Sequence, residues 1–246
     1  MKLQHIKQAI SDAKNQNHFT SLPPSFLKVD IPISASNTKS GQDDNNSITA
    51  RIEHFSTPLP PTLLYQCLRI FEENMGDLYR QSSWGLDMKE KRKEFVHDDA
   101  RFLVILTEEN AFNRTKSDVN GSEISQSTNA KSEPTVLGFV HYRFEPDDED
   151  DPIAPVSYVY ELQIQAMQQK SGLGKRLMSI VELLALKCRM EKVMLTVFKM
   201  NTKALGFYLH KMNYEVDECS PSNFQGEENE NCDYEILSKS LVVRSK

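Results

Sequence analysis

Cysteine is scarce in this sequence of 246 residues, which contains four: Cys67, Cys188, Cys219 and Cys232. Because no two of them form a C-x-x-C pair, neither a zinc site nor a disulfide framework is indicated, and we expect reduced thiols and no bound metal. A run of about 18 apolar residues, the length that a membrane helix needs, is also missing. The first residues lack the apolar stretch of a signal peptide, and Lys2 stands where N-myristoylation requires glycine. We therefore expect a protein inside the cell with no membrane attachment.

Positive charge is also in short supply, since 29 lysine and arginine residues stand against 35 aspartate and glutamate residues, a formal net charge of -6. Such a protein repels nucleic-acid phosphates unless it carries a separate basic patch, so no nucleic-acid partner is expected and a cationic substrate fits better. Acidic residues concentrate in two segments, 145–151 and 227–233. Solvated loops are the common interpretation of such runs, and it stays open for both segments.

Two polar segments divide the chain. Residues 1–47 are expected to form a short amphipathic helix followed by a mobile linker, because 34–47 has almost no apolar side chain with which to offset the entropy of ordering. The domain proper is expected to span 48–246. Within it, 110–134 is rich in Ser, Thr, Asn and Lys and lacks an apolar stripe, which predicts a disordered insertion.

The rest of the chain shows strand and helix periodicities in turn. The expected order is β-α-α-β-β-β-α-β-α-β, with strands at 47–55, 101–106, 135–144, 156–164, 193–198 and 234–243 and helices starting near 62, 87, 173 and 204. This pattern predicts an α/β (α+β) fold with a mixed sheet flanked by helices.

The most informative segment lies between a predicted buried strand and a long predicted helix, and it reads Gln169, Lys170, Ser171, Gly172, Leu173, Gly174, Lys175. Two glycines let a ligand approach the backbone, and the free N–H groups that open a helix suit a pyrophosphate. Lys175 adds positive charge. The spacing is neither that of a Walker loop nor that of a dinucleotide fingerprint. The glycines alone are more typical of a tight turn.

These residues resemble the acetyl-CoA signature Q/R-x-x-G-x-G/A of the GNAT superfamily of N-acetyltransferases, through Gln169, Gly172 and Gly174. Asn201 and Tyr208 stand in what looks like that superfamily's second motif. The resemblance implies the GNAT fold, with a mostly antiparallel sheet, and acetyl-CoA as co-substrate. It further implies that the co-substrate contacts Leu162, Gln163, Ile164, the residues 169–175 and Asn201.

Four further blocks resemble, within that superfamily, the N-terminal acetyltransferase D family, which acetylates the N-termini of histones four and 2A. The blocks are Tyr79 with Gln81–Gly85, Tyr158–Glu161, Val193–Lys199, and Ser220–Ser222 before Tyr234–Leu237. They span about 48 to 240, apart from the insertion, for which the family has no counterpart that we recognise. The sequence lacks the lysine-rich N-terminal extension of the family's animal members.

The resemblance assigns roles to residues near the predicted phosphate loop. Glu161 matches the family's essential glutamate and is our candidate base, because a buried carboxylate without a task is costly. Tyr158 and Tyr160 would orient the amine, a backbone N–H near Leu162 would face the developing oxyanion, and Tyr208 would protonate the leaving thiolate. His141 is a competing base, although a lone histidine in a strand is usually structural.

The histones in question begin Ser-Gly-Arg-Gly, so the arginine needs carboxylate partners. The family resemblance implies that the peptide contacts Tyr79, Trp84, Glu145, Asp147, Tyr160, Thr196 and Tyr234. Histone tails are the expected partners, with the ribosome as a second candidate, and the expected location is the cytoplasm and the nucleus. Two alternatives stay open: a lysine side-chain or polyamine acetyltransferase of the same fold, and a non-catalytic module that binds histone tails.

Overall fold

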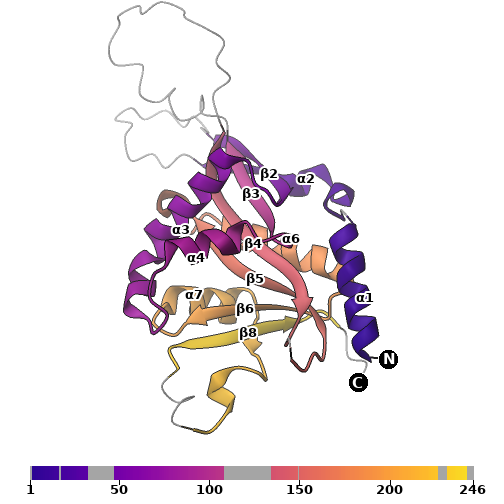
Figure 1. Cartoon of the computed structure of the whole chain (residues 1–246). Helices are drawn as coiled ribbons and strands as arrows, with labels where there is room; N and C mark the ends of the chain where they lie inside the picture. Colours follow the sequence, from indigo (N-terminus) through magenta and orange to yellow (C-terminus); the bar gives the residue numbers. More distant parts are fainter. Residues whose placement is uncertain are drawn as a thin grey trace, which may run out of the picture.

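Strands of the described chain form one eight-stranded sheet in the order β1-β2-β3-β4-β5-β6-β8-β7 (Figure 1). The computed structural model describes residues 2–16, 18–32, 47–107, 134–148, 150–226 and 232–242. The strands are β1 (Lys28–Pro32), β2 (Ser47–Ser56), β3 (Arg101–Thr107), β4 (Thr135–Pro146), β5 (Pro155–Ile164), β6 (Lys192–Phe198), β7 (Glu215–Val216) and β8 (Tyr234–Ser240). Only β5 and β6 pair in parallel, while the other neighbours are antiparallel. The predicted mixed, mostly antiparallel sheet is therefore confirmed.

Helices cover both faces of this sheet. They are α1 (Lys2–Asn15), η1 (His18–Ser21), α2 (Pro24–Leu27), α3 (Pro61–Gln81), α4 (Met88–Phe95), η2 (Ala166–Gln168), α6 (Leu173–Lys187), α7 (Thr202–Gly206), η3 (Phe207–Lys211) and η4 (Pro221–Asn223). In Figure 1, α3 and α4 lie on one face and α6 lies on the other. Each face has its own apolar core, so the sheet is buried between two helical layers. None of the helices in the described ranges has both the length and the apolar character to cross a membrane.

The described N-terminal residues pack onto the sheet, ahead of residue 48 where the domain proper is expected to begin. Strand β1 pairs with β2, and α1 buries Ile6, Ile10 and Ala13. The strand has only five residues, KVDIP, which is too short for a clear alternation in sequence. Of the expected linker and insertion, 34–46 and 110–133 lie outside the described residues.

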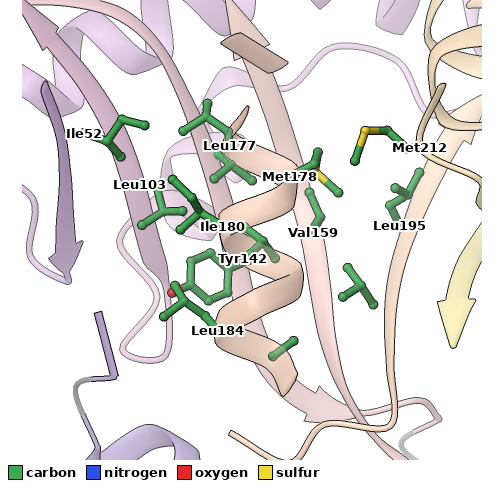
Figure 2. Close-up of a cluster of buried hydrophobic side chains, with 14 of the residues drawn as sticks. Ile52, Leu103, Tyr142, Val159, Leu177, Met178, Ile180, Leu184, Leu195 and Met212 are labelled. Carbon is green, nitrogen blue, oxygen red and sulfur yellow. The ribbon is translucent and has the colours of Figure 1, made fainter. Parts of the chain in front are cut away.

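Helix α6 anchors the larger core. Its residues Leu177, Ile180 and Leu184 are buried and pack toward Tyr142 and Val159 of the central strands, as Figure 2 shows. The spacing of these side chains, three or four residues apart, is the apolar stripe that predicted this helix. Because only residues 165–172 separate the end of β5 from α6, the same packing fixes the position of the helix N-terminus.

We expect Leu177→Ala to lower the free energy of unfolding by about 2–5 kcal/mol, because it leaves a cavity at a fully buried position. Leu186→Ala on the same helix is the control, since this side chain is 54% exposed and its loss should change the free energy by less than about 0.5 kcal/mol. Urea denaturation measures both. Equal effects of the two variants would contradict this description of the core.

Candidate active site

A cavity of about 220 Å³ opens where two neighbouring strands separate. Strands β5 and β6 pair with each other only between 156–159 and 192–195. Both strands continue past this point, but no longer as partners of each other. Ten of the residues predicted for the site line the cavity: Tyr79, Trp84, Tyr158, Tyr160, Glu161, Leu162, Gln163, Thr196, Asn201 and Tyr208. The separation thus gathers residues of α3, β5, β6 and η3, and of the loops that hold Trp84 and Asn201, around one space. It also leaves the backbone near Leu162 without a β6 partner.

A β-bulge places two consecutive side chains on the cavity side of β5. The register pairs His141 with Glu161 and then Tyr142 with Val159, so Tyr160 faces no residue of β4. A regular strand would send Tyr160 and Glu161 to opposite faces. Here both line the cavity, because a bulge re-aims the side chains that follow it.

The carboxylate of Glu161 is held on both oxygens. Oε1 accepts a hydrogen bond from Lys91 Nζ at 2.9 Å, and Oε2 accepts one from Gln163 Nε2 at 2.7 Å. The side chain is 4% exposed. Burial raises the pKa of Glu161 above its ordinary value, and the Lys91 ammonium opposes this rise. A carboxylate of this kind is a stronger base than one in water, which suits acceptance of a proton from an amine.

His141, the competing base, lies beneath the site. Its ring is fully buried and stacks between Phe102 and Tyr160, at 4.7 and 5.0 Å between ring centroids. Burial lowers the pKa of His141 to about 4, so the ring is neutral at physiological pH. It is not part of the cavity wall. The geometry therefore favours Glu161 as the base.

Both strand tyrosines present their rings to the cavity, but their hydroxyls have partners other than Glu161. Tyr160 donates to the Glu145 carboxylate at 3.0 Å, and the Tyr158 hydroxyl hydrogen-bonds with Thr196. Burial raises the pKa of Tyr158 to about 12 and also raises that of Tyr160. Both hydroxyls therefore remain protonated. Because Tyr160 donates its one proton to Glu145, its oxygen is left to accept a hydrogen bond from a substrate amine.

The two predicted acidic residues lie in different environments. Glu145 is not part of the cavity wall, but it accepts a hydrogen bond from Tyr160, which lines the cavity. Asp147 lies apart from the cavity wall: its Oδ1 accepts the N–H groups of Ile153 and Ala154, and its Oδ2 lies 3.5 Å from Lys192 Nζ. Because Asp147 closes the turn between β4 and β5, the structure does not bring it to the site as the resemblance implied.

The phosphate loop lies beside the open end of β5. Gly172 and Lys170 have φ angles of 88° and 64°, and Gln169 Nε2 donates to the Ile164 carbonyl at 3.2 Å. Residue 172 caps α6 without a side-chain hydrogen bond, and no hydrogen bond among the described residues uses the N–H groups of 170–175. Free N–H groups at the positive end of a helix dipole fit the diphosphate of acetyl-CoA. Gly172, Gly174 and the flanking residues therefore suit the role predicted for them.

On the β6 side, the cavity is closed by the start of α7 and by η3. Asn201 Oδ1 accepts the Ala204 N–H at 3.2 Å, so the side chain caps α7 while lining the cavity. Tyr208 is 7% exposed, and burial raises its pKa. Its hydroxyl is therefore a protonated group at the cavity wall, as a proton donor must be.

An aromatic cluster forms the mouth of the cavity. Trp84 is half exposed, and its ring centroid lies 5.1 Å from that of Phe198 and 5.2 Å from that of Tyr234. The Ser83 N–H donates to Asp233 at 2.7 Å, which ties the loop after α3 to the start of β8. Tyr234 thus lies next to Trp84, outside the cavity wall itself.

Sequence reasoning missed several residues that the structure places here. Lys91 and Glu94 appeared only as members of a charged helix, and Phe198 as a strand residue. Asn74, on α3, donates to Gln163 Oε1 and to the Ile164 carbonyl at 3.0 Å. The spacing of Lys91, Glu94 and Phe95 is that of one helical face, and it was the only local signal that this face is buried.

Residues 69–214 match the acetyltransferase (GNAT) family, which is more than half of the chain. Solved structures of similar fold include an acetyltransferase from Streptococcus agalactiae (TM-score 0.50, 13% identity, 77% of this chain and 98% of that one). The PaiA N-acetyltransferase from Thermoplasma acidophilum in complex with coenzyme A is another (TM-score 0.45, 15% identity, 77% and 98%). A third is Arabidopsis thaliana NAA60 in complex with a bisubstrate analogue (TM-score 0.48, 16% identity, 77% and 97%). The chain belongs to the GNAT family of acetyltransferases, whose acetyl donor is acetyl-CoA.

Proposed function

We propose that this acetyltransferase modifies the α-amino group of a protein N-terminus, and that its substrates are histones four and 2A, which begin Ser-Gly-Arg-Gly. The observation that carries this proposal is the buried Glu161 carboxylate at the cavity, flanked by aromatic walls. An α-amino group has a pKa of about 8, against about 10.4 for a lysine side chain. A carboxylate is a modest base, so it suits the α-amine better.

The cavity residues divide the chemistry among them. When bound, acetyl-CoA supplies a thioester whose carbonyl carbon forms the new bond to the amine nitrogen while its bond to sulfur breaks. Glu161 accepts the proton that the amine loses, directly or through one water. Tyr208 donates a proton to the departing sulfur and regains one as Glu161 releases its own. Beyond Val159, β5 no longer pairs with β6, and a backbone N–H near Leu162 on that side is the proposed donor to the carbonyl oxygen.

Glu145 is the proposed partner of the arginine at the third position of the substrate. We expect Glu145→Gln to raise KM for a Ser-Gly-Arg-Gly peptide by about tenfold or more, because a charge-assisted hydrogen bond contributes about 1.5–3 kcal/mol. A peptide with glutamine in place of that arginine should show little difference between the two enzymes. Steady-state kinetics of the four combinations measures the coupling.

Asp148→Asn is the matched control, since Asp148 is exposed and accepts the backbone N–H groups of Asp150 and Asp151 within its own turn. This variant should leave KM unchanged for both peptides. A uniform loss in Glu145→Gln, independent of the arginine, would count against the proposed contact.

Mass spectrometry of a short histone tail after incubation with acetyl-CoA tests the function itself. The acetyl group should appear on the N-terminal serine amine. Equal acetylation of the peptide and of an N-terminally blocked, lysine-containing version would favour a lysine acetyltransferase. No acetylation of either would remove histone tails from the proposal.

A further inference from the structure

We propose that Lys91 is a positioning residue that fixes the Glu161 carboxylate and keeps it ionised, and that Glu94 limits how strongly Lys91 does so. The inference rests on the proposed role of Glu161 as the base. It assigns a task to α4, a short charged helix that covers the sheet at the cavity.

The ammonium group of Lys91 has three N–H donors, and it contacts three residues. It contacts Glu161 Oε1 at 2.9 Å, Glu94 Oε2 at 3.0 Å and the Tyr79 hydroxyl at 3.2 Å. The Lys91 side chain is 8% exposed and lies 4.8 Å from the centre of the Phe71 ring. An ammonium with all its protons committed holds one position. Since Gln163 binds the second oxygen of Glu161, the carboxylate has one orientation.

Stability alone does not account for this buried pair. Desolvation of two charges often cancels their attraction, so an apolar pair of equal volume is commonly as stable or more stable. Phe71 and Phe95 next to the pair are both fully buried, so the surroundings of Lys91 are apolar and would accommodate an apolar side chain in its place. A buried lysine against a buried glutamate at the cavity wall therefore indicates a functional requirement.

The charges around Glu161 act on it with opposite signs. The groups that act on Glu161 directly are Tyr79 of α3, Lys91 and Glu94 of α4 and Tyr208 of η3. Behind them lie His141, next to Glu94, and Arg143, which donates to Tyr160. Lys91 lowers the pKa of Glu161, whereas Glu94 raises it. Glu94 itself is shared, because its carboxylate also lies 3.6 Å from His141 Nδ1. The carboxylate of Glu94 thus offsets part of the effect that Lys91 has on the pKa of Glu161.

Two variants should move the pH dependence of kcat in opposite directions. Glu161 accepts a proton only when ionised, so kcat falls as the pH drops through its pKa. In Lys91→Met the pKa of Glu161 rises, and the acid limb of kcat should shift upward by about 1–3 pH units. On the acid side of the profile kcat should therefore lie below that of the wild type, and it should recover at higher pH. In Glu94→Gln the limb should shift downward.

The experiment measures kcat against pH for the full-length chain with saturating Ser-Gly-Arg-Gly peptide and acetyl-CoA. Lys93→Met is the matched control, because Lys93 lies on the same helix but is exposed and pairs only with Glu90 among the described residues. Its profile should coincide with that of the wild type. Lys91→Arg keeps the charge and should keep a profile close to the wild type, even with a lower kcat. The substrate amine titrates equally in all variants, so differences between profiles belong to the enzyme.

Loss of activity without any shift in the acid limb of Lys91→Met would overturn the inference, and so would an unshifted profile in Glu94→Gln. If Lys91→Met does not fold, Glu94→Gln and Lys91→Arg still decide the matter. Failure of the proposed function is distinguishable, since the wild type would then not acetylate the peptide. A wild type that is active while both shifts are missing would contradict only the role of Lys91.

Discussion

Replacement of Glu161 by glutamine is expected to lower kcat by about a hundredfold to ten-thousandfold, the usual contribution of a general base. Glutamine has nearly the same shape, but its amide does not accept the amine proton. Binding of acetyl-CoA should stay close to the wild-type value, because the diphosphate is assigned to the N–H groups of 170–175 and not to β5. Steady-state kinetics and calorimetric titration with acetyl-CoA measure the two quantities.

The dependence of kcat on pH distinguishes Glu161→Gln, which removes the base, from Lys91→Met, which changes the pKa of the base. Glu161→Gln should not regain activity at high pH, whereas Lys91→Met should. Unchanged kinetics in Glu161→Gln would remove Glu161 from the role. A parallel loss of acetyl-CoA affinity would mean that the substitution disturbs the cavity as a whole.

The second large effect is expected at the phosphate loop. Gly172 has a φ of 88°, a conformation that a β-branched residue adopts at a cost of about 1–2 kcal/mol. No protein atom lies within 4 Å of a Cβ placed there. In Gly172→Val the backbone of the loop is therefore strained toward another conformation, which moves the N–H groups. The new side chain also occupies space next to these groups. The acetyl-CoA dissociation constant should rise about tenfold or more.

Gly206→Ala is the control for this prediction. A Cβ at residue 206 likewise meets no atom within 4 Å, and its φ of -62° is helical, so alanine fits without strain. Calorimetry should give this variant the wild-type dissociation constant. A wild-type constant in Gly172→Val as well would contradict the assignment of the diphosphate to this loop.

The sequence predicted those structural elements that depend on residues close together along the chain. Apolar side chains three or four residues apart predicted α6, and the glycines at 172 and 174 predicted the turn before it. The short apolar run at 101–106 and the β-branched and aromatic residues of 135–144 predicted β3 and β4. For such elements the local pattern and the final environment agree, because α6 buries one apolar stripe and β3 and β4 are buried on both faces of the sheet.

The ion pair of Lys91 with Glu161 joins residues 70 positions apart, and no local pattern reports it. The bulge at Tyr160 depends on pairing with β4, so a period of two wrongly separates Tyr160 from Glu161. Asp147 resembled a substrate ligand, yet the turn and Lys192 use its oxygens. Each of these outcomes was decided by contacts between distant segments.

A crystal structure of the protein with coenzyme A and a Ser-Gly-Arg-Gly peptide tests the central claim most directly. The diphosphate should accept hydrogen bonds of about 3 Å from N–H groups of 170–175. The sulfur should lie in the cavity between β5 and β6, with the peptide's terminal nitrogen within direct or one-water reach of Glu161. A diphosphate bound away from the start of α6, or a peptide N-terminus outside the cavity, would contradict the account.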